Sequence, residues 1–270
     1  MIGDQLLLND GEVPLSYNRI DVAAELQLRI DRLKRDFYSN ESGRVDYQAL
    51  RDSQGFKDYC VCCRQLQEYD LLNLKTVPER TAFWINLYNS LIVHGIIALD
   101  IRQTVKDVYD FFGRIYYRIG IADYSADDIE HGILRGNRRP PYGLFHPFDE
   151  GDIRLDYRVE EVDPRIHFAL VCGSSSCPPI NYYAADKLED QLEMAADNFI
   201  NGAEVEILPE QNLLRLSPIF RWYKSDFGGQ KGVLEALARY RKKPEDRIFL
   251  QEFGSKAHIE WKEYDWTLNS

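Results

Sequence analysis

The spacing of apolar residues along the chain predicts a helix-rich protein. Residues 20–37 and 56–71 repeat apolar side chains at intervals of three and four, which is typical of amphipathic helices. Residues 78–99 are apolar on every side, and a helix of this kind is expected to be buried. The other expected helices span residues 126–135, 184–199 and 233–240.

Short apolar runs and alternating runs predict strands between these helices. Residues 114–120 alternate as a half-buried strand does, and residues 165–172 form a short apolar run. Further extended pieces are expected at residues 45–47, 205–208, 213–216 and 259–266, the middle two as a hairpin. Without repeats or linkers, the pattern predicts one α+β domain over residues 18–270 after an irregular segment, residues 1–17.

Polar residues inside the expected helices make two local predictions. Asn86 and Asn89 share a face of the buried helix, where an unpaired amide costs about 1–3 kcal/mol. We therefore expect them to pin neighbouring backbone, with the orientation of a catalytic group as the alternative. Ser125 and Asp128 form a variant of the capping box that opens the next helix, and Gly136 ends it.

The charge balance limits the partners of the protein. The formal net charge is −11 at pH 7, so the chain as a whole would repel phosphate backbones and anionic membranes. We therefore expect neither a nucleic-acid partner nor a membrane protein. No export signal pattern follows Met1, which predicts a cytoplasmic protein whose five cysteines are reduced.

Three of the cysteines lie close together in the second expected helix. Cys60 and Cys63 fall on its apolar stripe beside Phe56, and Cys62 lies between them. No second Cys/His pair follows nearby at zinc-finger spacing. We expect two of the three thiols to point inward as small hydrophobic side chains.

The run from Ile166 to Pro179 carries the most reactive groups of the chain. An apolar stretch containing His167 leads through Gly173 into a serine-rich turn with Cys177, followed by two prolines. A thiol, an imidazole and converging backbone amides are the components of a nucleophilic site. Cys177 is therefore the candidate nucleophile, although a turn thiol with a structural role fits the same pattern.

Two histidines compete for the role of general base. If His167 lies on a strand, the chain runs about 17 Å away from it before the turn, so it meets Cys177 only after an immediate reversal. His131 is less constrained because it comes from a separate helix. Glu130 is expected to orient His167 rather than His131, since adjacent helical residues point about 100° apart.

Several long runs of the chain match the pattern of one family. They extend from Thr81 to His94, Asp128 to Arg135, Asp163 to Pro178, Ile219 to Gly228 and Tyr264 to Asn269. The chain resembles the family catalogued as domain of unknown function 547, and its eukaryotic-type members in particular. The resemblance implies a papain-like or transglutaminase-like core, with a buried central helix and an antiparallel sheet.

The resemblance leaves the chemistry open. In the papain-like arrangement the cysteine opens the buried helix, but here that helix carries Trp84 and Asn86 and no cysteine. The site is therefore either permuted or lost. Fold kinship by itself does not establish an activity.

Three functions remain as hypotheses from the sequence. The first is a thiol-dependent hydrolase or acyltransferase that acts on amide or ester bonds of a peptide and needs no cofactor or metal. The second is a non-catalytic scaffold that binds a protein through its acidic surface and the Arg-Pro-Pro-Tyr loop at residues 139–142. The third is a zinc site built from Cys172, Cys177, His167 and His131.

Overall fold

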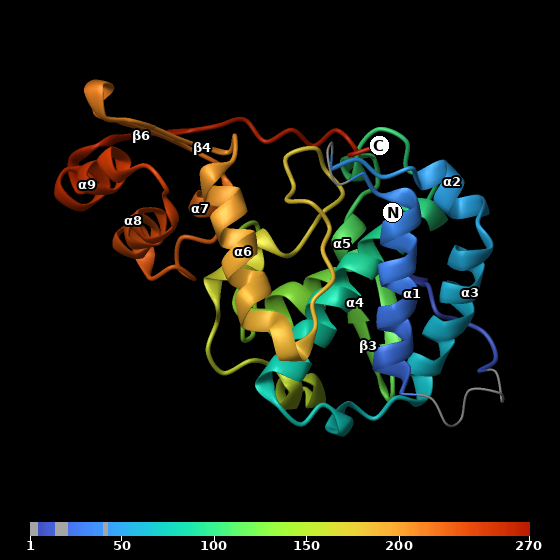
Figure 1. Ribbon diagram of the computed structural model, residues 1–270. Helices are drawn as coiled ribbons and strands as arrows, with labels where there is room; N and C mark the ends of the chain where they lie inside the picture. The colour runs from blue at the N-terminus through green and yellow to red at the C-terminus, as the bar shows by residue number, and fades with distance from the viewer. Residues whose placement is uncertain (1–4, 14–20, 40–42) are drawn as a thin grey trace. The chain divides into compact units, whose positions relative to one another are not determined.

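The structure is a computed structural model that describes residues 5–13, 21–39 and 43–270 (Figure 1). Helices predominate among these residues, which also form two small three-stranded sheets. This composition confirms the α+β class. The chain divides into two compact units. Unit 1 comprises Met1–Glu161, Leu170–Leu188 and Trp266–Ser270, and unit 2 comprises Val162–Ala169 and Glu189–Asp265. That residues 18–270 form one domain stays a prediction.

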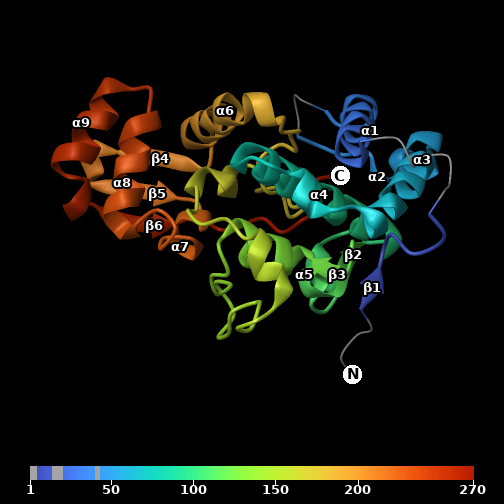
Figure 2. The same ribbon diagram turned by 90° about the horizontal axis from the view of Figure 1, so that it is seen from below.

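Unit 1 is built around one long helix, α4. Its elements are β1 (Leu6–Leu7), α1 (Val22–Phe37), α2 (Tyr47–Asp52), α3 (Gln54–Cys63), α4 (Val77–Ala98), α5 (Phe111–Arg114), β2 (Ile115–Ile119), β3 (Ala122–Ser125) and a π-helix (Asp128–Leu134). Short 3₁₀ turns join several of them. Figure 2 shows α4 between α1 on one side and the sheet on the other.

The sequence explains why α4 begins where it does and why it is buried. Thr76 and Glu79 form a capping box, and Pro78 occupies the first turn, where its missing N–H costs no hydrogen bond. By length and composition α4 could cross a membrane, but 94% of its most apolar window is buried inside the protein. The prediction of a buried helix over residues 78–99 is confirmed.

Asn86 and Asn89 fix to α4 the segments on either side of the serine-rich turn. The Asn86 amide donates to the carbonyl of Tyr183 at 2.7 Å and accepts from the N–H of the same residue at 2.9 Å. Asn89 accepts from the N–H of Val171 at 3.0 Å. Both side chains are therefore structural pins, as the sequence predicts, because each meets the hydrogen-bond needs of buried backbone.

The sheet of unit 1 includes a strand that the sequence pattern does not reveal. β1 pairs in parallel with β2, and β2 pairs antiparallel with β3. Asn9, fully buried, donates from its side chain to the carbonyls of Cys63 and Arg118. The segment 1–17 is thus not irregular throughout, although its residues 1–4 and 14–17 lie outside the described residues.

The second expected helix is shorter than its apolar pattern. α3 ends at Cys63 and continues as 3₁₀ turns to residue 73. Two of its three cysteines are fully buried, as expected, but they are Cys62 and Cys63, while Cys60 is half-buried. Of the extended piece at residues 45–47, Val45 alone forms a bridge, and Tyr47 already begins α2.

Unit 2 packs helices around a second small sheet (Figure 2). Its elements are α6 (Leu188–Asn201, from Glu189 onward), β4 (Val205–Leu208), β5 (Leu213–Leu216), α7 (Ile219–Trp222), α8 (Gly229–Tyr240), α9 (Pro244–Glu252) and β6 (His258–Trp261). The hairpin of β4 and β5 has the predicted bounds, and β6 pairs in parallel with β5. Phe168 and Phe220 lie at the centre of the core, 1% and 0% exposed.

Helix α9 is absent from the sequence prediction for a physical reason. It buries Phe249 and Leu250 but few other apolar side chains, so its apolar stripe is too short to be recognised. Its buried Asp246 accepts from the guanidinium of Arg241 at 2.8 Å. This ion pair stabilises the start of α9 through a contact that a periodic pattern cannot show.

Candidate functional site

The serine-rich turn holds two thiols side by side. The Sγ atoms of Cys172 and Cys177 are 2.8 Å apart, and both side chains are half-buried. The backbone N–H of Cys172 donates to Cys177 Sγ at 3.0 Å, and the Ser174 hydroxyl donates to the same sulfur at 3.3 Å. Donors directed at a sulfur stabilise its thiolate form.

The shape of the turn depends on a glycine and on the end of the chain. Gly173 has a φ of +80°, and a Cβ there would lie 2.5 Å from a methyl group of Ile96. The carbonyl of Gly173 accepts from the N–H of Asn269, and Ser174 forms a β-bridge with Leu268. Leu268 and Asn269, near the end of the chain, therefore hold the backbone of the thiol turn in place.

Cys172 is a member of this site whose importance the sequence analysis missed. In the sequence analysis, Cys172 is considered only as a possible zinc ligand. Its position five residues before Cys177, across a glycine that reverses the chain, is the signal that could have placed the two sulfurs together. Burial raises the pKa of Tyr47 well above its ordinary value, and nearby Tyr38, Cys177 and Cys172 add to this effect.

His131 and Glu130 lie on the π-helix and are both buried. Nδ1 of His131 accepts from the Arg135 guanidinium at 3.0 Å, so neutral His131 carries its proton on Nε2. Oε1 of Glu130 lies 3.7 Å from His131 Nδ1, too far for a good hydrogen bond. The nitrogen that a general base would use is thus occupied by a cation, which weakens His131 in that role.

An acidic residue directly before the π-helix, Asp127, was not selected by the sequence analysis. Asp127 accepts from the Tyr142 hydroxyl at 2.6 Å and lies 3.7 Å from Nε2 of His131. Burial is the main cause that raises the pKa of Asp127 to about 7, and the charge of Glu130 raises it further. A carboxyl group that titrates near neutral pH is a useful acid or base, although structural clusters produce such shifts too.

His167 lies on a 3₁₀ helix, Pro164–Phe168, and not on a strand. The prediction of a strand over residues 165–172 is therefore wrong. Asp163 caps the 3₁₀ helix and Pro164 opens it, so local capping outweighs the apolar run that follows. The distance argument against His167 loses its basis, because a 3₁₀ helix rises only about 2.0 Å per residue.

A carboxylate orients His167 within unit 2. Nε2 of His167 lies 2.9 Å from Oδ2 of Asp226, and both side chains are buried. The imidazole stacks on the ring of Tyr223, with centroids 3.8 Å apart and planes 16° apart. If Nε2 donates to Asp226, the lone pair of neutral His167 resides on Nδ1. In the serine-protease triad the two nitrogens have the opposite roles, because there the carboxylate accepts from Nδ1 and Nε2 is the base.

Asp226 is the residue that the sequence analysis should have selected as a partner of a histidine. Glu130 was expected there instead. Asp226 lies among aromatic residues in the run from Ile219 to Gly228, and an acidic residue in such a run indicates a buried carboxylate that needs a partner. Cys177, His131 and Glu130 belong to unit 1, and His167 belongs to unit 2.

The other thiols and the zinc hypothesis gain little from the structure. Burial raises the pKa of Cys60 and of Cys62 to about 11 and holds that of Cys63 well above its ordinary value, which keeps all three as unreactive thiols. Within the described part of the chain, no group of three or more His, Cys, Asp or Glu side chains is arranged to hold a metal ion. The geometry therefore gives the zinc site no support.

Comparisons with known proteins agree with the resemblance over the middle of the chain. No curated protein and no solved structure matches the chain significantly. The family model described as "Protein of unknown function, DUF547" matches residues 71–200. This span contains α4, the π-helix and the thiol turn, whereas the runs that begin at Ile219 and Tyr264 lie beyond it. Over residues 71–200 the chain is therefore similar to the DUF547 family, whose function is unknown.

Proposed function

We propose that the protein is a thiol-dependent hydrolase or acyltransferase that acts on amide or ester bonds, with Cys177 as the nucleophile. The observation that carries the proposal is the pair of donors on Cys177 Sγ, the Cys172 N–H and the Ser174 hydroxyl. Their combined effect favours the thiolate, which is the reactive form of cysteine. The papain-like or transglutaminase-like relation belongs to the proposal and is supported by the burial of α4 beside β2.

The reaction has two steps. The thiolate attacks the carbonyl carbon, and the leaving group departs with the bonding electrons and takes a proton, which produces a thioester on Cys177. Water or an acceptor amine then attacks the thioester and regenerates the thiol. A histidine would accept the proton of the thiol and return it to the leaving group.

His167 and His131 remain the two candidates for this base. His167 has the carboxylate partner that a triad histidine needs, namely Asp226. His131 accepts from a guanidinium at Nδ1, which opposes proton uptake at that nitrogen. The experiment below distinguishes the two candidates.

Alkylation by iodoacetamide across a pH series tests the nucleophile. We expect Cys177 to react with a midpoint at least one pH unit below about 8.5, the ordinary value of a free cysteine. Mass spectrometry of the peptides assigns the label, and the buried Cys62 serves as the internal control. The variants His167→Asn and His131→Asn then identify the base. The alkylation midpoint of Cys177 should rise by about one pH unit in the variant that removes the histidine stabilising its thiolate, and should stay unchanged in the other. A midpoint at or above 8.5 in the unmodified protein would falsify the assignment.

Acyl transfer itself is tested with p-nitrophenyl acetate. We expect a burst of p-nitrophenolate equal to the protein concentration and one acetyl group on Cys177, followed by slow turnover. The Cys177→Ser variant should lose the burst, while Cys60→Ser should keep it. Alkylation without acetylation would leave Cys177 a reactive thiol and not a catalytic one, which contradicts the proposal.

A second candidate function is a non-catalytic interaction scaffold. The loop after the π-helix exposes two large apolar side chains, with Leu144 78% and Phe145 82% exposed. Exposed apolar side chains of this size favour a protein contact. The scaffold predicts that Cys177→Ser leaves partner binding intact and that Leu144→Ser with Phe145→Ser abolishes it. Loss of binding in Cys177→Ser contradicts it.

A further inference from the structure

The thiol of Cys172 takes no part in the proposed acyl transfer, yet it lies beside the nucleophile. Its Sγ is 2.8 Å from Sγ of Cys177, and both cysteines are free thiols. Thiol–disulfide exchange is a chemistry that uses two adjacent thiols, because one attacks a disulfide and the second resolves the mixed disulfide that forms. The pair therefore meets the first requirement of a site for this exchange.

Hydrogen bonds make the two thiols inequivalent. The backbone N–H of Cys172 is directed at Sγ of Cys177, at 3.0 Å, and the Ser174 hydroxyl donates to the same sulfur at 3.3 Å. The Ser174 oxygen also lies 3.2 Å from Sγ of Cys172, but its single proton serves one sulfur at a time. The donors favour the thiolate on Cys177, and the thiolate is the form that attacks. Cys177 is therefore the attacking thiol, and Cys172 is the resolving one.

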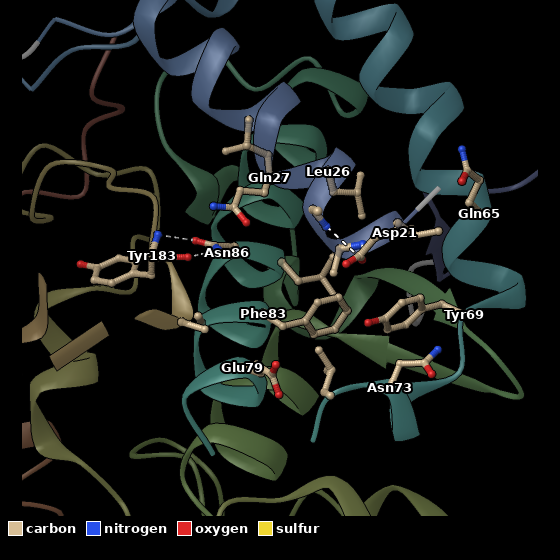
Figure 3. A pocket seen from close by; sticks show the side chains of 18 of the residues that line it. Asp21, Leu26, Gln27, Gln65, Tyr69, Asn73, Glu79, Phe83, Asn86 and Tyr183 are labelled. Atoms are coloured by element: carbon tan, nitrogen blue, oxygen red, sulfur yellow. Dashed lines mark hydrogen bonds between the residues drawn. The ribbon is translucent and has the colours of Figure 1, made fainter. Parts of the chain in front are cut away.

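The backbone on both sides of the turn is anchored to α4, which keeps the resolving thiol close. One anchor is Asn89, which accepts from the N–H of Val171, the residue before Cys172. The other is Asn86, whose amide holds the backbone of Tyr183 beyond the turn (Figure 3). Two reacting groups held in this way react as one molecule, and the second step is then fast.

We propose that the thiol turn is a dithiol site that reduces the disulfide bond of an external compound. The Cys177 thiolate attacks one sulfur of that disulfide, and the other sulfur leaves as a thiolate and takes the proton of Cys172. Sγ of Cys172 then attacks Sγ of Cys177, and the second external sulfur leaves as a thiolate. The dithiol loses two electrons and the external disulfide gains them, and an external thiol reductant restores the dithiol.

This activity shares Cys177 with the proposed acyl transfer but does not depend on it. Oxidised glutathione, added in excess to the reduced protein, tests both steps of the exchange. We expect the unmodified protein to release two glutathione molecules per chain and to end with the Cys172–Cys177 disulfide and no glutathione adduct. Mass spectrometry of the whole protein and of its peptides measures both products.

Two serine variants separate the attacking thiol from the resolving one. Cys172→Ser should stop after the first step, with one glutathione released and one glutathionyl group on Cys177. Cys177→Ser should react at least about tenfold more slowly, because Cys172 lacks the donors that favour a thiolate. Cys60→Ser, at another half-buried cysteine, is the matched control and should behave as the unmodified protein does.

The same variants distinguish this proposal from acyl transfer. Serine at residue 172 keeps the backbone N–H that donates to Cys177, so Cys172→Ser should retain the burst with p-nitrophenyl acetate while it loses turnover of disulfides. Turnover is measured with dithiothreitol as the reductant. Oxidised glutathione represents a small disulfide and insulin a protein disulfide, and the one that is reduced faster identifies the class of substrate.

Three results would overturn the proposal. The first is an unmodified protein that ends with a stable glutathione adduct on Cys177, because Cys172 would then not resolve it. The second is equal reaction rates of Cys172→Ser and Cys177→Ser with oxidised glutathione. The third is reduction of neither glutathione disulfide nor insulin above the rate of dithiothreitol alone. Loss of the p-nitrophenyl acetate burst without these results would contradict acyl transfer and leave the dithiol site supported.

Discussion

Cys172 and Cys177 form a pair of thiols poised to become a disulfide. Their sulfurs lie 2.8 Å apart, and a disulfide needs about 2.05 Å, so a shift of less than 1 Å joins them. A mild oxidant such as diamide would take up the two hydrogen atoms that the thiols lose. We expect one intramolecular disulfide, a protein lighter by two hydrogens, and loss of Cys177 alkylation that dithiothreitol reverses.

The control for this prediction is Cys172→Ser. In that variant Cys177 lacks its neighbouring thiol and should stay open to alkylation after the same treatment. Cys62 and Cys63 are fully buried and should remain thiols throughout. If diamide leaves Cys177 alkylation unchanged in the unmodified protein, the two sulfurs do not form the predicted bond.

At this scale the sequence predicted residue types better than their partners. Asn86 and Asn89 were recognised as pins because a buried amide must be satisfied wherever it lies. Asp226 was missed because its partner, His167, is 59 residues away, and nothing in local spacing reports such a contact. Of this pair, only His167 belongs to the reactive run from Ile166 to Pro179.

The π-helix Asp128–Leu134 is the element whose stability should depend most on pH. In the folded state Asp127, just before it, has a pKa of about 7, above its ordinary value of 3.8. Between these values the folded protein binds a proton that the unfolded chain does not. The contribution of Asp127 to stability is therefore present below pH 4 and is lost as the pH rises through 7.

The variant Asp127→Asn tests this dependence. It keeps an oxygen for the Tyr142 hydroxyl and cannot ionise. We expect it to match the unmodified protein near pH 4 and to exceed its free energy of unfolding by about 2–4 kcal/mol at pH 8. Urea unfolding at the two pH values measures the difference. Asp156→Asn, on the exposed surface, is the control, and a pH-independent difference for Asp127→Asn would contradict the assignment.

The elements that the sequence predicted well are those with a long or repeated pattern. α4 and the hairpin of β4 and β5 appear at their expected positions. The apolar residues on all sides of α4 and the apolar runs on both sides of the hairpin turn are local patterns that can be recognised in the sequence. The strand expected at residues 165–172 failed because a cap and a proline at its start favour a 3₁₀ helix. A largely apolar run of eight residues is too short to decide between the two structures.

The division into two units could not be predicted, because neither unit is one continuous segment. Val162–Ala169 belongs to unit 2 but is flanked on both sides by residues of unit 1, and no change of composition marks its ends. Phe168 nevertheless lies in the core of unit 2. Boundaries of this kind depend on tertiary contacts, which a single sequence does not display.

The same interleaving of the two units predicts one cooperative unfolding transition. The chain passes from one unit to the other after residues 161, 169, 188 and 265, and unit 1 needs the end of the chain, where Leu268 and Asn269 are buried. Ile92→Ala in unit 1 and Phe220→Ala in unit 2 each remove a fully buried side chain and should cost about 2–5 kcal/mol. We expect either variant to lower the urea midpoint of the whole chain, so that hydrogen exchange reports the same midpoint for peptides of α4 and of α8. Separate midpoints in Phe220→Ala, with α8 exchanging first, would show two domains in place of the single domain predicted over residues 18–270.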